Sequence, residues 1–429
     1  MSTTQPNIYS CPIIAATPTN KAHFFGYHDL CPWNKQDNTL ILLRTDPTIA
    51  ERVPNGHDIA EICLWQPESD TLEPIAETKA WNWQQGARLQ WLPNTHSSII
   101  YNTIENKTIN SVILDLSTQT QKILPFSIAA ISPSGQIALS PHFGRLGKYW
   151  PAYGYAGIES PNIDELAPAE DGLWQIDLVT GKVSLRFSLL EMLEQEMLTQ
   201  LPNTAHFIAH PSFSPHGSHF AFMHRFMTPD GALYSRLFIS DTNGSNYHLL
   251  AEEKVSHFDW YDDNTILVWT RFSGKSLTSI RRSHLLVNPL FMPIIRKLRQ
   301  LAPRLKQSLF KEGYYLIDIH DPQNRQIVGM GLLEQDGHPM FSTDRQWIVT
   351  DTYPDKNHNQ TLILFNQMTN QRIDIGKFQA KEITNSDIKC DLHPRWNRAN
   401  TRLCVDSTHN GIRQCLIIDP TMVLHQSYY

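Results

Sequence analysis

The stretch His210–Gly217 reads HPSFSPHG and leads into the apolar run Phe220–Met223. A histidine, an aromatic residue three positions later and a Ser-Pro-x-Gly turn predict a short strand that turns into a second, buried strand. Related stretches are SHFDW (256–260), GHPMF (337–341) and LHPRW (392–396), and each of them also leads into an apolar run. This recurrence predicts an architecture of repeated units, each built from short strands.

Similar units begin near Gly26, where His28 stands at the equivalent position, and near Gly86 and Ile131, which lack the histidine. A later strand in most units ends near an acidic residue, as in Leu416–Asp419, and a turn rich in Asn, Gly, Thr or Pro follows. Seven units of four short strands predict an all-β protein, namely a seven-bladed β-propeller. We expect the segment Ile8–Ile14 to supply the last strand of the seventh unit.

We expect residues 1–429 to form a single propeller domain with two insertions, at 142–171 and 274–312. The first insertion is a loop rich in Gly, Tyr and Arg, and loops of this length are usually functional or disordered. Residues 188–201 have the spacing of a short amphipathic helix. The segment 274–312 is basic and amphipathic, which fits either an anionic membrane surface or a helical flap with a solvated basic face.

The composition narrows the class of protein. A net charge of −6 over 429 residues argues against a dedicated nucleic-acid binder, which would normally be basic. The six cysteines show no CxxC pairing, which favours free thiols in a reducing compartment. No secretory signal and no apolar run of about 18 residues is visible, so we expect a cytoplasmic protein, with 274–312 as the candidate for peripheral contact with the inner membrane.

Four histidines, His210, His257, His338 and His393, stand at the start of the first strand of consecutive units. In a propeller this strand lies nearest the axis, so radial units would bring the imidazoles together at one mouth of the channel. Imidazole is the commonest metal ligand in proteins, and the pattern therefore predicts a divalent metal, Mn or Zn. A metal-free acid/base or ligand-binding cluster, and a purely structural use, remain the alternatives.

Carboxylates accompany two of these histidines. Asp336 precedes His338 by two residues, and Asp391 precedes His393 by two. Residues two apart on a strand share a face, so either carboxylate could bind the metal itself or accept a hydrogen bond from a metal-binding imidazole and so fix its tautomer. The alternative is that both aspartates cap turns.

Basic and aromatic side chains near the expected mouth suit a carboxylate-bearing saccharide. Arginine binds a carboxylate bidentately, and tyrosine combines an apolar ring with a hydroxyl group that can transfer a proton. Each such residue could instead form a surface ion pair or pack a loop. The candidates for substrate binding are His28, Arg88, Arg145, Arg395 and Tyr353, and those for catalysis in the first insertion are Tyr149 and Tyr155.

The Ser-Pro-x-Gly turns that follow an aromatic or apolar strand, as in Phe213–Gly217 and Ile131–Gly135, resemble the repeats of TolB-like β-propellers over essentially the whole chain. The histidines at the blade starts resemble those of the oligogalacturonate lyases, which are cytoplasmic seven-bladed propellers. That family binds manganese through histidines and a glutamine, and uses a histidine and an arginine in β-elimination.

The resemblance implies metal ligands at His257, His338 and His393, and a catalytic pair of His210 with Arg225. No counterpart of the family's ligand glutamine is evident, so Asp336 or Asp391 would have to replace it. The two insertions are not typical of the family either.

These observations together predict a cytoplasmic propeller that acts on an acidic saccharide, most directly as a metal-assisted lyase that cleaves a uronate-containing chain by β-elimination. One alternative is a non-catalytic propeller that scaffolds the assembly of surface polysaccharide at the inner membrane. Another is a glycoside hydrolase on the same fold.

Overall fold

The computed structural model describes residues 7–195, 204–227, 233–244, 246–252, 254–272 and 310–426. The chain divides into two compact units, and each is described by itself. Unit 1 contains Asn162–Trp174 and Leu185–Asp336, and unit 2 contains Thr4–Pro161, Gln175–Ser184 and Gly337–Tyr429. Most of the basic insertion predicted at 274–312 lies outside the described residues, and the single domain over 1–429 stays a prediction.

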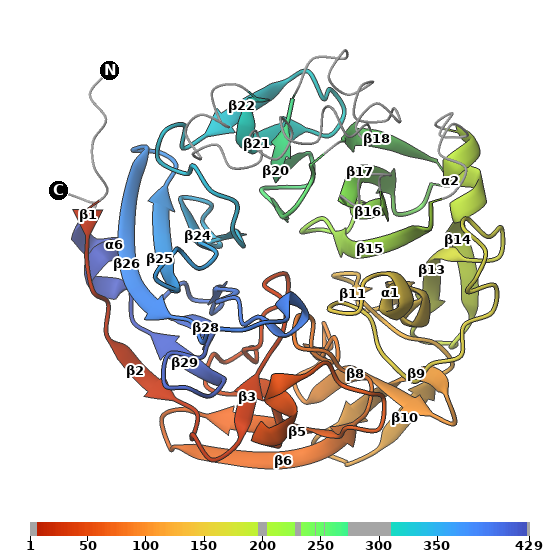
Figure 1. The fold of residues 1–429 in the computed structure, drawn as a ribbon, viewed down its shortest axis with the longest axis horizontal. Coiled ribbons are helices and arrows are strands. Elements are labelled where there is room, and N and C mark those ends of the chain that lie inside the picture. The colour runs from red at the N-terminus through yellow and green to blue at the C-terminus, as the bar shows by residue number, and fades with distance from the viewer. Residues whose placement is uncertain are drawn as a thin grey trace. The chain divides into compact units, whose positions relative to one another are not determined.

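The strands form seven antiparallel sheets, six with four strands and one with a fifth strand added in parallel, which confirms the predicted seven-bladed β-propeller (Figure 1). Within each sheet, neighbouring strands mostly follow one another along the chain. The first sheet contains β3 (Ala22–Phe24), β4 (Leu40–Thr45), β5 (Ala60–Gln66) and β6 (Thr71–Thr78), and the second contains β7 (Gln90–Trp91), β8 (Ser98–Glu105), β9 (Thr108–Asp115) and β10 (Gln121–Leu124). The third contains β11 (Ala130–Ile131), β12 (Ile137–Pro141), β13 (Gly172–Asp177) and β14 (Val183–Ser188). The fourth contains β15 (His206–Phe213), β16 (His219–Met227), β17 (Leu233–Asp241) and β18 (Tyr247–Ala251).

The last three sheets carry the remaining blade-start histidines. Their strands are β19 (Phe258–Trp260), β20 (Thr265–Arg271), β21 (Glu312–Asp318) and β22 (Arg325–Val328); β23 (Met340–Phe341), β24 (Trp347–Asp351), β25 (Asn359–Asn366), β26 (Gln371–Gln379) and β1 (Asn7–Ile8); and β27 (Arg395–Trp396), β28 (Leu403–Ser407), β29 (Gln414–Ile418) and β2 (Ile13–Ala16). The described helices are α1 (Phe143–Tyr149), α2 (Leu189–Gln195), α6 (Thr421–Gln426) and the 3-10 helices η1 (Pro47–Glu51) and η4 (Ser386–Ile388).

The inner strands are apolar on both faces because neighbouring sheets cover them from both sides. All six residues of β4, LILLRT, are buried except Arg44, which is half-buried. One core of unit 2 joins Ile41 and Leu43 of β4 with Ile99 of β8. Sheets that pack face to face in this way hold the loops at the strand ends in fixed positions.

The N-terminal segment completes the last sheet, as predicted, but the strand that does so is Ile13–Ala16, and only the last two residues of the predicted segment Ile8–Ile14 belong to it. Strand β2 pairs antiparallel with β29, with Ala15 opposite Ile417. The preceding strand β1 pairs in parallel with β26 of the neighbouring sheet, with Ile8 opposite Asp374 (Figure 1). The N-terminal segment therefore joins the outer edges of two sheets in unit 2.

The first insertion, 142–171, contains the helix α1, whose Phe143 stacks on Tyr155 with ring centroids 4.4 Å apart. The helix predicted at 188–201 is present as α2 over its described part, Leu189–Gln195. None of the helices in the described ranges has the length and apolar character needed to cross a bilayer.

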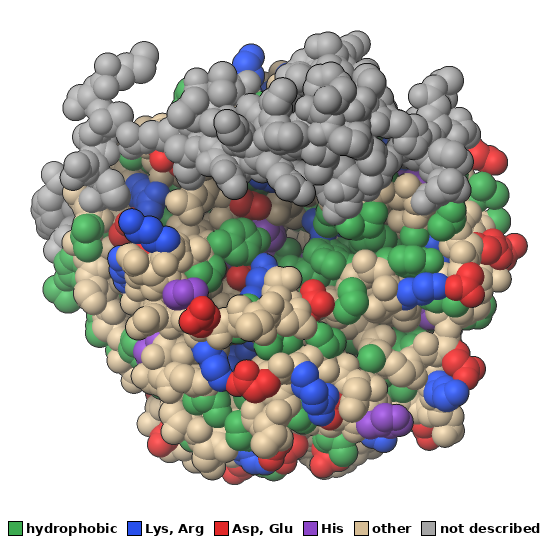
Figure 2. Space-filling view, in the orientation of Figure 1, with side chains coloured by type: hydrophobic (Ala, Val, Ile, Leu, Met, Phe, Trp, Pro, Cys, Tyr) green, Lys and Arg blue, Asp and Glu red, His purple; other side chains and the backbone are tan. Residues whose placement is uncertain are grey.

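The distribution of charged side chains on the surface agrees with the modest net charge. Acidic and basic side chains are interspersed over the described residues on the face drawn in Figure 2. All six cysteines are free thiols, as predicted. Burial raises the pKa of Cys63 and of Cys390 to about 12, which keeps both thiols protonated near neutral pH.

Candidate metal and saccharide site

Three histidines gather in unit 2 from loops that are far apart in the chain. His28 follows β3, His338 precedes β23, and His393 precedes β27. The ring centroids of His338 and His393 are 4.3 Å apart, and His28 lies 5.4 Å from His338 and 6.2 Å from His393. Each of the three residues is at most 2% exposed. Two of the four predicted histidines thus meet, together with a third that was expected only to bind substrate.

Each imidazole of this cluster is held through Nδ1 by an oxygen that can only accept a hydrogen bond. Nδ1 therefore carries the proton, and Nε2 of the neutral ring presents a lone pair. The hydrogen bonds run from His28 to the Pro339 carbonyl (2.9 Å), from His338 to Asp351 Oδ1 (2.8 Å) and from His393 to the Gly26 carbonyl (2.7 Å).

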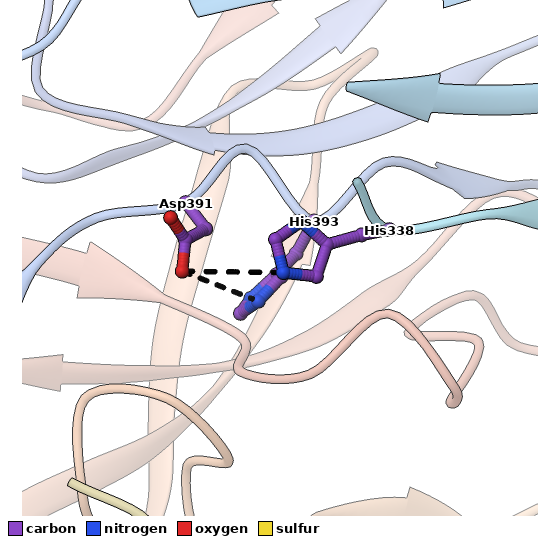
Figure 3. Close-up of side chains that lie close together, drawn as sticks. All are labelled: His338, Asp391 and His393. Carbon is purple, nitrogen blue, oxygen red and sulfur yellow. Dashed lines mark ion pairs between the residues drawn. The ribbon is translucent and has the colours of Figure 1, made fainter. Parts of the chain in front are cut away.

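Asp391 completes a group that could hold a metal ion (Figure 3). Its Oδ2 lies 4.0 Å from Nε2 of His338 and 3.9 Å from Nε2 of His393, and the ligand atoms of the three residues lie within 4.8 Å of one another. Nε2 of His393 is buried and has no hydrogen-bond partner among the described residues. Imidazole and carboxylate donors suit Mn or Zn, so the residues present fit a divalent ion.

Asp351 lies behind the cluster and fixes two of its loops. Its carboxylate accepts the backbone N–H of His338 (2.9 Å) and of His393 (3.2 Å) in addition to Nδ1 of His338. Gly337 allows this approach, because a Cβ at that position would lie 2.0 Å from the Asp351 carbonyl oxygen. The end of β24 therefore determines where both imidazoles stand.

The two adjacent imidazoles have opposite pKa shifts. Burial lowers the pKa of His338, but the charge and hydrogen bond of Asp351, with the charge of Asp391, outweigh it and raise this pKa above its usual value. Burial holds the pKa of His393 well below its usual value, and the neighbouring His338 and Arg395 lower it further. His393 is therefore the more readily available neutral donor.

An aromatic residue, Tyr353, and a cationic residue, Lys389, lie beside the cluster. The ring of Tyr353 packs edge-on against His338 with centroids 5.6 Å apart, and Nζ of Lys389 lies 4.5 Å from the centroid of the Tyr353 ring. The same Nζ is 2.8 Å from Asp391 Oδ2, and the Lys389 side chain is 27% exposed. Lys389 thus contacts the buried carboxylate of Asp391 and is itself partly exposed to solvent.

Two arginines predicted to bind substrate are buried and paired within unit 2. Arg395 is 0% exposed, lies 3.3 Å from Asp406 and donates to the Gly26 carbonyl. Arg88 forms a 2.8 Å ion pair with Asp29. In this structure Arg395 positions the carbonyl that holds His393, and a contact of either arginine with substrate stays a prediction.

The loop residues predicted to act in catalysis or binding contact one another and the neighbouring strand β8. Asn102 donates a hydrogen bond of 3.2 Å to the hydroxyl of Tyr155, and burial raises the pKa of Tyr155. The guanidinium of Arg145 lies 5.1 Å from the ring centroid of Tyr149. The roles of Tyr149, Tyr155 and Arg145 toward a substrate stay predictions.

The other predicted residues belong to unit 1. His257 Nδ1 lies 2.9 Å from Asp336 Oδ1, so this carboxylate holds an imidazole, whereas the metal-competent group among the described residues contains Asp391. His210 has a φ of +50°, at a bulge in β15. Arg225 is buried, and its Nη2 lies 3.5 Å from the Ser256 carbonyl oxygen. The assignments of His210, Arg225, His257 and Asp336 stay predictions.

Sequence reasoning did not single out Asp351, Lys389 or Gly26. Asp351 ends a strand of the sheet that also carries His338, and Lys389 precedes Asp391 by two residues, so both lie close to motifs that the sequence highlights. Gly26 precedes the Tyr27-His28 pair and has a φ of +129°. Only the fold shows that its carbonyl faces His393.

No family model matches the sequence, and no curated protein matches it either. Solved structures are similar in fold. Oligogalacturonate lyase from Vibrio parahaemolyticus has a TM-score of 0.60 at 13% identity, covering 96% of this chain and 98% of that one. An oligogalacturonate lyase in complex with manganese has a TM-score of 0.61 at 12% identity, with the same coverages of 96% and 98%. TolB from Acinetobacter baumannii has a TM-score of 0.40 at 14% identity, covering 78% of this chain and 63% of that chain.

The likenesses to the two oligogalacturonate lyases show the fold. The chain is a seven-bladed β-propeller, and the predicted resemblance to the oligogalacturonate lyases is confirmed at that level.

Proposed function

We propose that this protein is a metal-assisted lyase that cleaves a uronate-containing oligo- or polysaccharide by β-elimination. The observation that carries the proposal is the buried group of His338, Asp391 and His393, in which Nε2 of His393 has no hydrogen-bond partner among the described residues. The similarity in fold to two oligogalacturonate lyases, one of them in complex with manganese, supports it.

The reaction requires a defined movement of protons and electron pairs. A base removes the proton from C5 of the uronate, a double bond forms between C4 and C5, and the C4–O bond breaks. The electron pair of that bond stays with the leaving oxygen, which takes up a proton. A divalent ion would supply positive charge beside the C6 carboxylate, which makes the C5 proton more acidic.

In the proposal, His338, His393 and Asp391 would hold the ion, and Asp351 keeps His338 oriented with its lone pair toward it. Tyr353 offers a ring face to the sugar, and Lys389 offers a partly exposed ammonium group to its carboxylate.

The base must be an unprotonated group with a lone pair, such as a neutral imidazole or an ionised carboxylate. Within unit 2 this description fits His28, because its Nδ1 proton is engaged by the Pro339 carbonyl at 2.9 Å and the lone pair is then on Nε2. The pair of His210 and Arg225, implied by the family resemblance, is the alternative source of the base and of charge stabilisation. The variants His28→Gln and His210→Gln separate these alternatives, since only loss of the base abolishes turnover while Mn²⁺ binding is retained.

The test is incubation of the protein with uronate oligosaccharides and Mn²⁺. We expect the ultraviolet absorbance of an unsaturated uronate to rise, and to stay flat after removal of the metal with EDTA or in the double variant His338→Ala/His393→Ala. The exposed Lys356→Met is the control variant and should behave as the wild type. Saturated products would identify a glycoside hydrolase, and no cleavage of any uronate polymer would favour a non-catalytic scaffold.

A further inference from the structure

Three cationic or metal-binding groups face one carboxylate oxygen. Asp391 Oδ2 lies 2.8 Å from Nζ of Lys389, 4.0 Å from Nε2 of His338 and 3.9 Å from Nε2 of His393. The Asp391 side chain is 1% exposed, so its charge needs a partner inside the protein. In this structure the ammonium group of Lys389 provides such a partner.

The oxygen near both Nε2 atoms is the one that Lys389 contacts, so a divalent ion held by the two imidazoles would compete with Lys389 for it. The ion would also stand close to the Lys389 ammonium group, and like charges repel more strongly in a partly buried site than in water. The metal ion and Lys389 are therefore alternative counter-charges for one carboxylate.

Lys389 has room to leave Asp391. Its backbone is fixed, because its carbonyl accepts hydrogen bonds from Gln84 Nε2 (2.8 Å) and Arg413 Nη2 (2.9 Å). Its side chain, in contrast, is 27% exposed and already lies over the ring of Tyr353, where a cation is favoured. The ammonium group can move toward solvent and the ring while the main chain stays in place.

We propose that Lys389 is a built-in counter-cation of Asp391 that the metal ion must displace, so that this lysine sets the metal affinity of the site. The inference rests on the proposed function for the identity of the site. It adds that Lys389 weakens metal binding and that its ammonium group, once displaced, becomes available to pair with a uronate carboxylate. Lys389 is thus a regulator of the site in the metal-free protein, not a ligand.

The test is calorimetric titration of the EDTA-treated full chain with Mn²⁺. We expect Lys389→Met to bind Mn²⁺ at least about tenfold more tightly than the wild type, because the ammonium charge that competes for Asp391 is gone. Lys389→Gln keeps a hydrogen-bond donor for Asp391 and should show the same direction, which covers a failure of the methionine variant to fold. Lys356→Met, an exposed lysine of the same unit, should leave the affinity unchanged.

A double-mutant cycle isolates the shared oxygen. In the Asp391→Asn background, where Mn²⁺ binding is weaker, the Lys389→Met substitution should change the affinity by less than about threefold. Unchanged or weaker binding in both single lysine variants would overturn the inference, as would no Mn²⁺ binding by either the wild type or the variants. If only the lysine variants bind Mn²⁺, the displacement of Lys389 by the metal ion is supported and the proposed function of the wild type is refuted. If the lysine variants bind Mn²⁺ more tightly but the wild type cleaves no uronate, the displacement of Lys389 is still supported and only the proposed lyase activity is refuted.

Discussion

His338 and His393 are neighbours with centroids 4.3 Å apart, yet their surroundings shift their pKa values in opposite directions. The difference comes from Asp351, which accepts Nδ1 of His338 at 2.8 Å, whereas Nδ1 of His393 meets the neutral Gly26 carbonyl at 2.7 Å. A carboxylate behind an imidazole fixes its tautomer and strengthens it as a metal ligand. At the scale of single residues, the site therefore depends on a carboxylate that need not touch a metal.

Asp351→Asn tests this dependence. The amide can still accept from Nδ1 but lacks the charge, so we expect Mn²⁺ affinity to fall by about 10- to 100-fold. Calorimetric titration measures the change. Asp355→Asn, an exposed residue in the loop after β24, is the control and should leave the affinity within about twofold, since its carboxylate caps a turn away from the imidazoles. Equal affinities in wild type and Asp351→Asn would refute the role given to this aspartate.

His23 gives a prediction about stability against pH. Burial, with the charge of Arg44, lowers the pKa of His23 from 6.5 to about 4. Between these two pH values the unfolded chain binds a proton that the folded chain does not, so the free energy of unfolding falls as the pH is lowered, by up to about 1.4 kcal/mol per pH unit. His23→Gln should show a shallower loss over this window in urea unfolding. Parallel pH profiles for the two proteins would contradict the prediction.

At the level of strands and loops, one backbone conformation recurs within or just before the first strand of several sheets. Arg88, His210 and His393 have φ values of +50°, +50° and +44°, which non-glycine residues rarely adopt. Strain of this kind is typical of functional positions, although packing elsewhere must offset it.

Gly26 connects this backbone geometry to the site. Its φ is +129°, and a Cβ there would lie 2.7 Å from the carbonyl carbon of Gln85. Gly26→Ala should therefore destabilise the fold by about 1–3 kcal/mol or more and displace the carbonyl that holds His393. We expect a lower melting temperature together with weaker Mn²⁺ binding.

Gly331→Asn is the matched control for Gly26→Ala. Its φ is +75°, a Cβ at that position would meet no atom within 4 Å, and asparagine tolerates that conformation. It should remain within about 0.5 kcal/mol of the wild type. A Gly26→Ala variant with wild-type melting and metal affinity would show that the close approach at Gln85 is not required.

For the molecule as a whole, the N-terminal segment joins two outer sheet edges in unit 2. Strand β1 covers β26 and strand β2 covers β29. An uncovered strand edge exposes backbone groups that pair with other chains. The chain therefore depends on these two strands both for stability and for solubility.

A chain that begins at Thr17 lacks both strands. We expect its melting temperature to fall by several degrees and its sedimentation to show concentration-dependent association. A chain that begins at Asn7 keeps both strands and is the control. If the shorter chain melts like the control and stays monodisperse, the N-terminal strands are dispensable.

The seven units and the closing segment could be predicted from the sequence because each strand is a local pattern of apolar runs and turns. The meeting of His338 and His393 could be predicted as well, since both lie in a repeated motif, whereas their use as metal ligands stays a prediction. Asp351 and Lys389 were not singled out, and His28 was expected only to bind substrate. These assignments depend on which loops of different sheets lie side by side, and no local pattern encodes that. Asp336 holds His257 in unit 1, which agrees with the expectation that it could fix an imidazole, and its role as a metal ligand stays a prediction.

Both proposals require that His338, Asp391 and His393 together hold a divalent ion. Elemental analysis after dialysis against Mn²⁺ measures this without relying on a substrate, on the wild type and on the double variant His338→Ala/His393→Ala. We expect about one equivalent of manganese per wild-type chain and essentially none in the double variant. Equal metal content in the two proteins, or none in the wild type, would contradict the metal site.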